Sequence, residues 1–337
     1  MSHQATLTIS PAYARGSSLS RHPFWHELPE IHDDLDRVRD RVIAEASSAR
    51  GAVGDALCDY VARPGKMLRP GCVIIGSWAG SSRATDRIIE IAAAVETLHL
   101  ATLIHDDVID ESPMRRGQPS LHSIYGRREA VLMGDYLLSR CFQMIGQGTS
   151  RENALGLAAA TGHLVRSELD QLDQCDSPRL SRRAYFRRIA GKTAVLFGLS
   201  LTTGAHEAGA KPRVVAVLAR AGYAMGMAFQ VIDDVLDFTA DEARLGKPVG
   251  TDLRIGLYTL PVIEAVRRDP SIAAALSGEF DLTALIARVR QAGGIAAARN
   301  VAAAYTARAQ IAIDRLPVQP VRDGLSMLVR SLLSRDH

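Results

Sequence analysis

Residues 96–117 read ETLHLATLIHDDVIDESPMRRG, an apolar run that ends in a cluster of three aspartates followed by two arginines. A second apolar run, GMAFQVIDDVLDF at residues 226–238, ends in another three aspartates. On a helix the first and third aspartates of each cluster lie one turn apart on the same face, and the middle one is rotated by about 100°. Both runs are apolar nearly all the way round, which predicts two central helices surrounded by others.

The rest of the chain also favours helix. Stretches rich in Ala, Leu, Val and Arg, which are strong helix formers, alternate with short breaks, and aromatic residues make up only 5% of the chain. We therefore expect an all-α protein. No linker-like segment and no internal repeat marks a boundary, so residues 26–337 are expected to form one domain after a disordered tail at 1–25. The expected helices lie near residues 27–49, 53–62, 67–79, 84–110, 127–147, 151–174, 181–205, 211–240, 256–268, 281–291, 294–315 and 318–334.

The overall charge and the cysteines exclude several classes of protein. The 337 residues include 40 Lys and Arg against 37 Asp and Glu, so no global field predicts nucleic-acid binding. The four cysteines form no C-x-x-C pair, which predicts reduced thiols packed in the core of a cytoplasmic protein. The N-terminal 25 residues hold no signal-peptide core and no stretch has 18 consecutive apolar residues, so we expect at most peripheral membrane contact.

The two aspartate clusters indicate a metal site. Carboxylates one turn apart repel each other, and burial at the end of an apolar helix increases the repulsion unless a cation neutralises it. Oxygen ligands favour Mg²⁺, which keeps several waters and commonly shares its coordination shell with substrate phosphates. One cluster alone could equally be a solvated last turn of a helix. Two clusters, beginning at Asp106 and Asp233, favour packed helices that hold a diphosphate through metal ions.

Basic residues near the clusters complete a diphosphate site. Arg115 and Arg116 directly follow the first cluster, and their planar guanidinium groups suit phosphate oxygens. Lys66 and Arg69 lie three residues apart at a predicted helix start, where free backbone N–H groups and the helix dipole also favour an anion. The sequence therefore predicts binding groups for more than one phosphate group.

Other basic segments receive different interpretations. The sequence Gly-Lys-Thr at 191–193 resembles the end of a nucleotide-binding P-loop, but Phe186 replaces a glycine that the motif requires. We therefore exclude nucleotide binding there and keep Lys192 as a candidate phosphate contact. The Arg-Arg pairs at 127–128 and 187–188 are interpreted as surface charge. Lys247 follows the second aspartate cluster much as Arg115 follows the first.

From about Pro64 to Pro261 the chain resembles the trans-isoprenyl (polyprenyl) diphosphate synthase family, of the medium- and long-chain type. The matching stretches occur in the family's order: GKMLRP, ETLHLATLIHDDVIDESPMRRGQPS, MGDYLLSR, SELDQL, AGKTA, AFQVIDDVLDF, GKPVGTDL and TLP. The resemblance implies a single large helical bundle around a central cavity, an isoprenoid synthase-like fold, and a homodimer. It also implies head-to-tail condensation of isopentenyl diphosphate onto an allylic diphosphate (dimethylallyl, geranyl, farnesyl or geranylgeranyl), with three Mg²⁺ ions per active site.

The resemblance further implies a role for each matching residue. One departure is Leu257, which stands where many members have a lysine, so one phosphate contact is missing. The implied ligands of isopentenyl diphosphate are Lys66, Arg69, His99 and Arg116. The implied Mg²⁺ ligands are Asp106, Asp110 and Asp233, with Asp107, Asp234 and Asp237 coordinating directly or through water. The implied ligands of the allylic diphosphate are Arg115, Lys192, Thr193, Gln230 and Lys247.

Residues one turn before Asp106 are expected to form the floor of the tunnel for the growing product. These are Ala101 and Thr102, and relatives with short products often carry a bulky aromatic residue at the Ala101 position. A small residue there predicts a product of twenty or more carbons. Three alternatives stay open: a geranylgeranyl diphosphate synthase, a terpene cyclase-like enzyme of the same fold, and a non-catalytic subunit of a two-component synthase.

Overall fold

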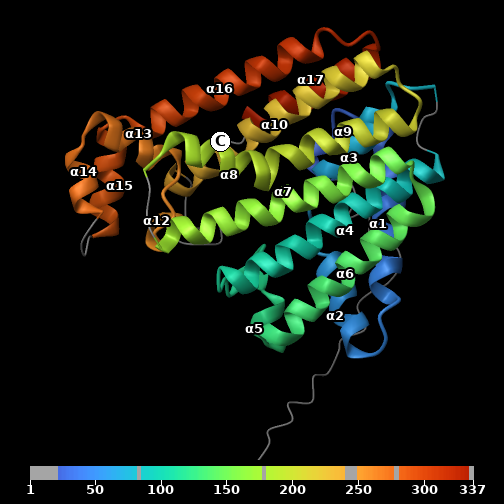
Figure 1. Ribbon diagram of the computed structural model, residues 1–337, viewed down its shortest axis with the longest axis horizontal. Coiled ribbons are helices and arrows are strands. Elements are labelled where there is room, and N and C mark those ends of the chain that lie inside the picture. The colour runs from blue at the N-terminus through green and yellow to red at the C-terminus, as the bar shows by residue number, and fades with distance from the viewer. Residues whose placement is uncertain (1–21, 82–84, 177–179, 240–248, 277–280, 334–337) are drawn as a thin grey trace, which may run out of the picture.

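The computed structural model describes residues 22–81, 85–176, 180–239, 249–276 and 281–333, and these residues are almost entirely helical (Figure 1). The N-terminal part contains η1 (Pro23–Trp25), η2 (Pro29–Ile31), α1 (His32–Ser47), α2 (Ala52–Val61) and α3 (Leu68–Ser77). The middle part contains α4 (Asp86–Ile109), β1 (Met114–Arg115), β2 (Gln118–Pro119), α5 (Leu121–Tyr125), α6 (Arg127–Gly148), α7 (Arg151–Asp176), α8 (Arg182–Ile189), the π-helical turn η3 (Ala190–Ala194), α9 (Val195–Glu207) and α10 (Pro212–Thr239). The C-terminal part contains α12 (Thr251–Arg254), α13 (Leu260–Arg268), α14 (Ser271–Ala275), α15 (Leu282–Gln291), α16 (Gly294–Ile313) and α17 (Gln319–Leu333).

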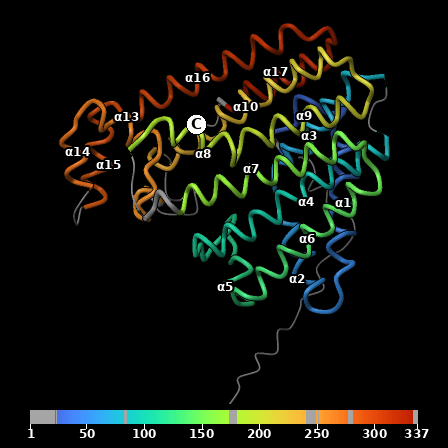
Figure 2. The backbone as a smooth tube through the Cα atoms, viewed as in Figure 1, coloured from blue at the N-terminus to red at the C-terminus, as the bar shows by residue number. Residues whose placement is uncertain are grey.

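The two apolar runs form the predicted central helices. Helix α4 packs mainly against α3 and α6, and α10 packs mainly against α9 and α16, as the backbone trace also shows (Figure 2). Both helices are long and apolar enough to cross a membrane, but 72% and 56% of their most apolar windows are buried inside the bundle. Because neighbouring helices cover most of both, we assign them to the protein core. The all-α prediction is confirmed.

Close backbone contacts bring the π-helical turn beside α10. A Cβ atom on Gly226 of α10 would lie 2.5 Å from the Cα of Ala194, and one on Gly222 would lie 2.8 Å from the carbonyl oxygen of Phe197. Only glycine allows helices to approach this closely. The approach places η3 beside the turn of α10 that precedes the second aspartate cluster, where Thr193 contacts Gln230.

Several predicted elements differ from the structure. The helix predicted at 27–49 begins only at His32, because Pro29 lies in a separate 3₁₀ turn. The helix predicted at 181–205 is interrupted by the π-helical turn at 190–194. The helix predicted at 256–268 begins at Leu260, because Gly256 has a φ of 78° and lies outside the helical region. The short helices α5, α12 and α14 and the strands β1 and β2 were not predicted.

The two short strands form a hairpin directly after the first aspartate cluster. Met114 pairs with Pro119 and Arg115 with Gln118, so Arg116 and Gly117 form the two-residue turn. Both turn residues have positive φ values, 53° and 73°, as the type I′ turn of a tight hairpin requires. The sequence lacks the Asn-Gly signal typical of such turns, which is why the hairpin was missed. Its effect is to fix the two arginines at the rim of the cavity described next.

Candidate active site

Three connected compartments lie between the central helices. The largest, with a volume of about 720 Å³, is lined by Asp106 and Asp110 from α4 and by Asp233 from α10. A second compartment of about 310 Å³ shares Arg69, His99, Arg116 and Phe229 with the first. A third of about 340 Å³ lies beneath the second cluster and shares Asp110, Lys192, Gln230, Asp233, Asp252 and Ile255 with the first. Both aspartate clusters and both sets of basic residues therefore face one continuous space.

The outer aspartates of the first cluster face the cavity, whereas the middle one faces the protein. Asp107 is buried, and its Oδ1 accepts a hydrogen bond of 2.8 Å from Nε of Arg115. Asp106 lines the cavity, and burial raises its pKa to about 7 although Lys192 opposes the shift. This arrangement follows from the rotation of the middle residue by about 100° on a helix. Arg115 therefore reaches the cavity while it is anchored on Asp107.

The second cluster has the same arrangement with a different anchor. The Oδ2 atom of Asp234 accepts a hydrogen bond of 2.6 Å from the hydroxyl of Tyr185, and its Oδ1 accepts one of 3.0 Å from Nε2 of Gln230. The hydroxyl of Thr193 in turn donates a 2.7 Å hydrogen bond to Oε1 of Gln230. Burial raises the pKa of Asp234 to about 7, against the effect of its two hydrogen-bond donors. Asp233 alone faces the largest compartment.

Asp237 is buried at the end of α10 and lines the third compartment. Its Oδ2 atom accepts a hydrogen bond of 3.3 Å from the backbone N–H of Asp252, and its carbonyl oxygen accepts one of 2.8 Å from Gly250. These contacts hold the segment after the second cluster against the end of α10. Leu257, the residue that replaces the usual lysine, lies in the wall of the same compartment.

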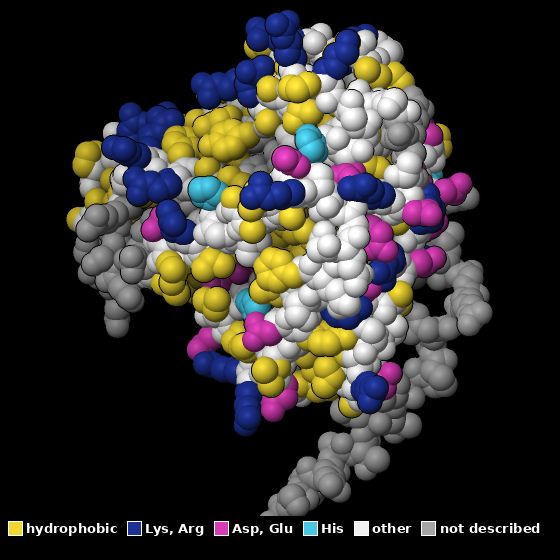
Figure 3. Space-filling model, turned by 45° about the vertical axis from the view of Figure 1, so that its right-hand side comes forward, with side chains coloured by type: hydrophobic (Ala, Val, Ile, Leu, Met, Phe, Trp, Pro, Cys, Tyr) yellow, Lys and Arg dark blue, Asp and Glu magenta, His cyan; other side chains and the backbone are white. Residues whose placement is uncertain are grey.

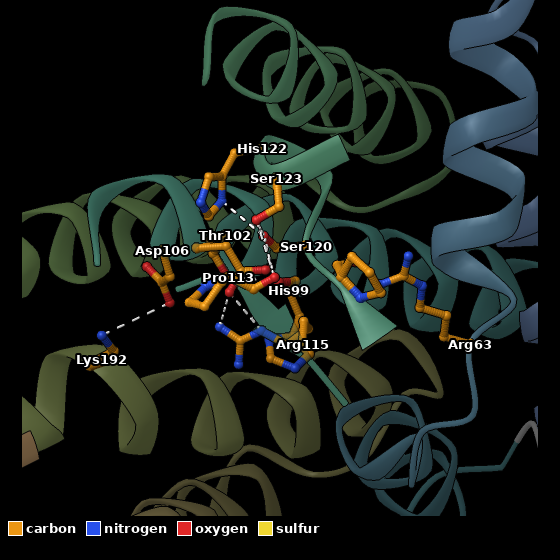
Figure 4. Close-up of polar contacts among 12 residues, drawn as sticks. Arg63, His99, Thr102, Asp106, Pro113, Arg115, Ser120, His122, Ser123 and Lys192 are labelled. Carbon is orange, nitrogen blue, oxygen red and sulfur yellow. Dashed lines mark hydrogen bonds and ion pairs between the residues drawn. The ribbon is translucent and has the colours of Figure 1, made fainter. Parts of the chain in front are cut away.

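Lys192 projects from the π-helical turn toward both clusters. Its Nζ lies 2.8 Å from Oε1 of Glu168 on α7 and 3.9 Å from Oδ2 of Asp106 (Figure 4). Burial works against the charged form, but Asp106 and Glu168 outweigh it and raise the pKa of Lys192. The ammonium group is therefore charged and lies between Glu168 and the first aspartate cluster. π-helical turns are frequent at functional sites.

The second compartment holds a separate basic group. The guanidinium group of Arg69 is buried 5.4 Å from the ring centroid of Phe197, and Nζ of Lys66 lies 5.7 Å from that of Phe24. Burial lowers the pKa of Arg69, although Glu96 opposes the shift. Burial, together with Arg69 and the two neighbouring arginines, holds the pKa of His99 well below its usual value. A neutral imidazole thus lies among cations at one end of the cavity.

Contacts between distant segments fix the loop that carries these cations. Nη1 of Arg116 donates a 3.2 Å hydrogen bond to the carbonyl oxygen of Pro64, and Nη1 of Arg63 donates one of 3.0 Å to that of Pro119. Met67, between Lys66 and α3, has a φ of 49°. Positive φ at a residue other than glycine costs about 1–3 kcal/mol and is concentrated at functional sites. The hairpin and the start of α3 thus form one rim of the cavity.

Sequence reasoning missed or misplaced several residues of this site. Arg188, predicted to be surface charge, is only 3% exposed, lies 5.5 Å from the ring centroid of Tyr185 and lines the third compartment. Its spacing from Lys192, four residues along the helix, is the signal that could have identified it. Tyr185, Glu168 and Asp252 gave no signal of their own. Arg127 is exposed as predicted, with a partner in Glu111.

Two further predictions concern Lys247 and the floor of the product tunnel. Lys247 lies outside the described residues. Thr102 lines the cavity and donates a 2.8 Å hydrogen bond to the carbonyl oxygen of His99, whereas Ala101 is fully buried in α4.

Among the described cysteines, Cys72 and Cys141 are buried and Cys58 is half-buried, all as free thiols. Their packing agrees with the prediction.

The donor set fits divalent cations that share their ligands with a diphosphate. Among the described residues, no three carboxylates, imidazoles or thiols lie close enough together to hold an ion alone. However, Asp106, Asp110 and Asp233 face one cavity from two helices, and burial makes ionised Asp106 unfavourable without a cation. Magnesium keeps few protein ligands and completes its shell with water and phosphate oxygens. The residues therefore fit metal ions that bind together with the substrate.

Comparisons with known proteins agree with this geometry. The family model described as polyprenyl synthetase matches residues 52–287. The chain is 34% identical over 315 residues to heptaprenyl diphosphate synthase component 2 of Geobacillus stearothermophilus, covering 91% of this chain and 97% of that protein. It is 33% identical over 304 residues to the all-trans-nonaprenyl-diphosphate synthase (geranyl-diphosphate specific) of Rhodobacter capsulatus, covering 88% and 93%.

Solved structures show the same fold. Heptaprenyl diphosphate synthase from Staphylococcus aureus superimposes with a TM-score of 0.87 at 30% identity, covering 91% of this chain and 99% of that one. The polyprenyl synthase from Caulobacter crescentus CB15, complexed with calcium and isoprenyl diphosphate, superimposes with a TM-score of 0.85 at 31% identity, covering 96% and 99%. That complex joins a divalent metal and an isoprenyl diphosphate in one protein of this fold.

Proposed function

The chain belongs to the polyprenyl synthetase family and is a polyprenyl diphosphate synthase with a C20 or longer product, and we propose that it adds isopentenyl diphosphate head-to-tail to an allylic diphosphate. The observation that carries this proposal is the continuity of the cavity. One end is lined by Lys66, Arg69 and Arg116, the other by both aspartate clusters and Lys192. Two separate diphosphate sites in one space support a condensation rather than a hydrolysis.

In the proposed reaction the allylic C–O bond breaks, a C–C bond forms to the isopentenyl double bond, and one proton leaves with the released diphosphate. Asp106, Asp110 and Asp233 would hold divalent cations, proposed to be three Mg²⁺ ions, which would supply neutralising charge for the leaving diphosphate. Arg115 and Lys192 hold the same diphosphate in place. Each is anchored on a carboxylate, Arg115 on Asp107 and Lys192 on Glu168, so neither has to reorganise as charge develops.

At the other end of the cavity, Lys66, Arg69 and Arg116 bind the isopentenyl diphosphate. Neutral His99 shares this compartment and adds a hydrogen-bonding group without further charge. Buried Phe197 beside Arg69 and half-buried Phe24 beside Lys66 keep the alkyl parts of both basic side chains in fixed positions. Fixed cations hold the double bond close to the allylic carbon, and this positioning supplies much of the rate enhancement of a two-substrate reaction.

We also propose a homodimer in the cytoplasm. Large apolar side chains are exposed on α6 and α7, where a partner's equivalent helices would cover them. The exposed residues are Val131, Leu132, Phe142, Leu155, Val165, Leu169 and Leu172. Replacing Leu132 and Leu169 together by Arg should give a monomer in sedimentation velocity, and an unchanged mass would place the dimer contact elsewhere.

A second candidate function, a subunit that needs a partner, is favoured by one observation. Both heptaprenyl relatives named as component 2 resemble this chain over about nine-tenths of its length. Because both aspartate clusters and both basic groups face the cavity, we propose that this chain is the catalytic component. Whether it is active alone is decided by assaying the purified chain.

Replacement of the cavity carboxylates tests the proposed mechanism. Asp106→Ala and Asp233→Ala should each abolish incorporation of radiolabelled isopentenyl diphosphate while the circular dichroism spectrum is unchanged. Asp59→Ala, at an exposed position on α2, is the matched control and should retain full activity. Near wild-type incorporation by either cavity variant would refute the assignment.

A further inference from the structure

A separate groove lies between α10 and α16, away from the aspartate clusters. Its volume is about 440 Å³. The floor contains Val217, Ala224 and Ala312, and the aromatic rings of Tyr223 and Tyr305 form part of the walls. Three arginines surround it: Arg220 from α10, Arg308 from α16 and Arg315 just beyond the end of α16.

The charge around this groove is of one sign. Helix α16 carries Arg299 and Arg308 and no Asp or Glu, and residues 212–232 of α10 carry Arg213 and Arg220 and no Asp or Glu. The nearest acid in sequence, Asp314, accepts a 2.8 Å hydrogen bond from Nε2 of Gln310.

The three arginines of the groove are exposed and have no carboxylate partner among the described residues. Arg308 is instead stacked 5.1 Å from the ring centroid of Tyr305. Within the part of the chain that the structure describes, the groove thus presents positive charge that no neighbouring carboxylate neutralises.

Apolar side chains are exposed between these charges. Ile311 is 55% exposed and Tyr223 is 40% exposed. In Figure 3, Lys and Arg side chains lie together with hydrophobic ones along the upper edge of the molecule, the edge along which α16 runs in Figure 1. Arginine and tyrosine beside exposed aliphatic residues are typical of surfaces that lie in the headgroup layer of a bilayer.

We propose that this groove docks the protein on an anionic phospholipid surface, with Arg220, Arg308 and Arg315 against lipid phosphates and Ile311 among the acyl chains. The proposal rests on the proposed function in one respect: a hydrophobic polyprenyl product would have to pass from the protein into a lipid phase. A second copy of this chain fits the groove poorly, because a two-fold axis would place these arginines against each other. An acidic, phosphate-bearing lipid surface complements both the charge and the exposed apolar residues.

Vesicle co-sedimentation tests the proposal. The wild-type protein should sediment with vesicles of phosphatidylcholine mixed with phosphatidylglycerol and stay in solution with pure phosphatidylcholine. An arginine near an anionic membrane strengthens binding by roughly five-fold. The double variant Arg220→Glu/Arg308→Glu removes two such contacts and should weaken binding by at least about 25-fold. Ile311→Ser should weaken binding without changing its dependence on salt.

The control and the other outcomes are equally specific. The double variant Arg151→Glu/Arg183→Glu makes the same charge change at exposed positions on α7 and α8 and should bind vesicles nearly as well as the wild type. All variants should condense water-soluble substrates at the wild-type rate without vesicles. If the proposed enzymatic function is wrong, this activity assay fails, whereas the result of vesicle co-sedimentation is unaffected. Equal vesicle binding by both double variants would overturn the docking proposal. So would a change in sedimenting mass of the Arg220/Arg308 variant alone, because it would make the groove a contact between copies.

Discussion

The hydroxyl of Tyr185 is expected to position the second aspartate cluster. It donates a 2.6 Å hydrogen bond to Asp234, both residues are buried, and Asp234 is adjacent to the cavity residue Asp233. In Tyr185→Phe the ring stays in place, but Oδ2 of Asp234 loses its donor. A hydrogen bond to a charged group contributes about 1.5–3 kcal/mol, and a buried acceptor left without a donor loses that amount.

The variant should therefore lower kcat by about ten-fold to a hundred-fold if the whole loss is expressed in the transition state. The KM for isopentenyl diphosphate should not change, because Tyr185 contacts Asp234, whereas Lys66 and Arg69 line a compartment that includes neither of these two residues. The same variant should unfold at lower denaturant concentration at pH 8. The loss should shrink at pH 5, where Asp234 of the metal-free protein, with a pKa of about 7, is already protonated.

Tyr60→Phe is the matched control. Tyr60 is also buried, but its hydroxyl has no hydrogen-bond partner among the described residues, so the same atom is removed without loss of a hydrogen bond. Steady-state kinetics and urea unfolding of both variants give the comparison. If Tyr185→Phe is as active and as stable as Tyr60→Phe, the positioning role of the hydroxyl is refuted.

Three further expectations follow from the site. Arg188→Met should lower kcat by at least about ten-fold, because the buried guanidinium group of Arg188 lies beside Asp234. A rate equal to that of the wild type would show that Arg188 has no role in the site. In the metal-free protein the pKa values of Asp106 and Asp234 are raised to about 7, so the folded state binds more protons than the unfolded chain between about pH 4 and pH 7. Its unfolding free energy should therefore fall as pH rises through this window, and a stability that rises from pH 5 to pH 8 would contradict the raised pKa values. Mg²⁺ with inorganic diphosphate should release protons on binding, which calorimetry in buffers of different ionisation enthalpy measures. Thr102→Phe, at a cavity-lining position, should shorten the product in mass spectrometry, and Ala101→Tyr should do the same if the tunnel passes the buried side of α4; unchanged lengths in both would place the floor elsewhere.

Much of the fold could be predicted because its signal is local. The lengths of α4 and α10 follow from uninterrupted apolar runs, and Gly256, Pro29 and the π-helical turn explain where boundaries were misplaced. The hairpin at 114–119 could not be predicted, since its Arg-Gly turn is not a common type I′ sequence. Its turn and its second strand form hydrogen bonds with Pro64 and Arg63, which are distant in sequence.

The sequence predicted which residues form the site more fully than it predicted how their side chains are oriented. Helical spacing separated the outer from the middle aspartates, but it could not show that Arg115 anchors on Asp107 or that Tyr185 anchors on Asp234. Those partners come from other elements, and only packing brings them together. Arg188 was missed for the same reason, because the sequence of an Arg-Arg pair predicts exposure to solvent and does not show which helix buries one of the two side chains.

The most direct test of a repeated condensation is the mass of the product made by the purified chain alone. The protein is incubated with Mg²⁺, isopentenyl diphosphate and, in separate reactions, each of the four allylic primers. Prenyl diphosphates that differ by single isoprene units and extend to C20 or beyond are predicted, with no product after removal of Mg²⁺ by a chelator. A cyclised hydrocarbon would contradict the account, whereas no incorporation of isopentenyl diphosphate by the chain alone would leave only the second candidate, a catalytic component that needs a partner.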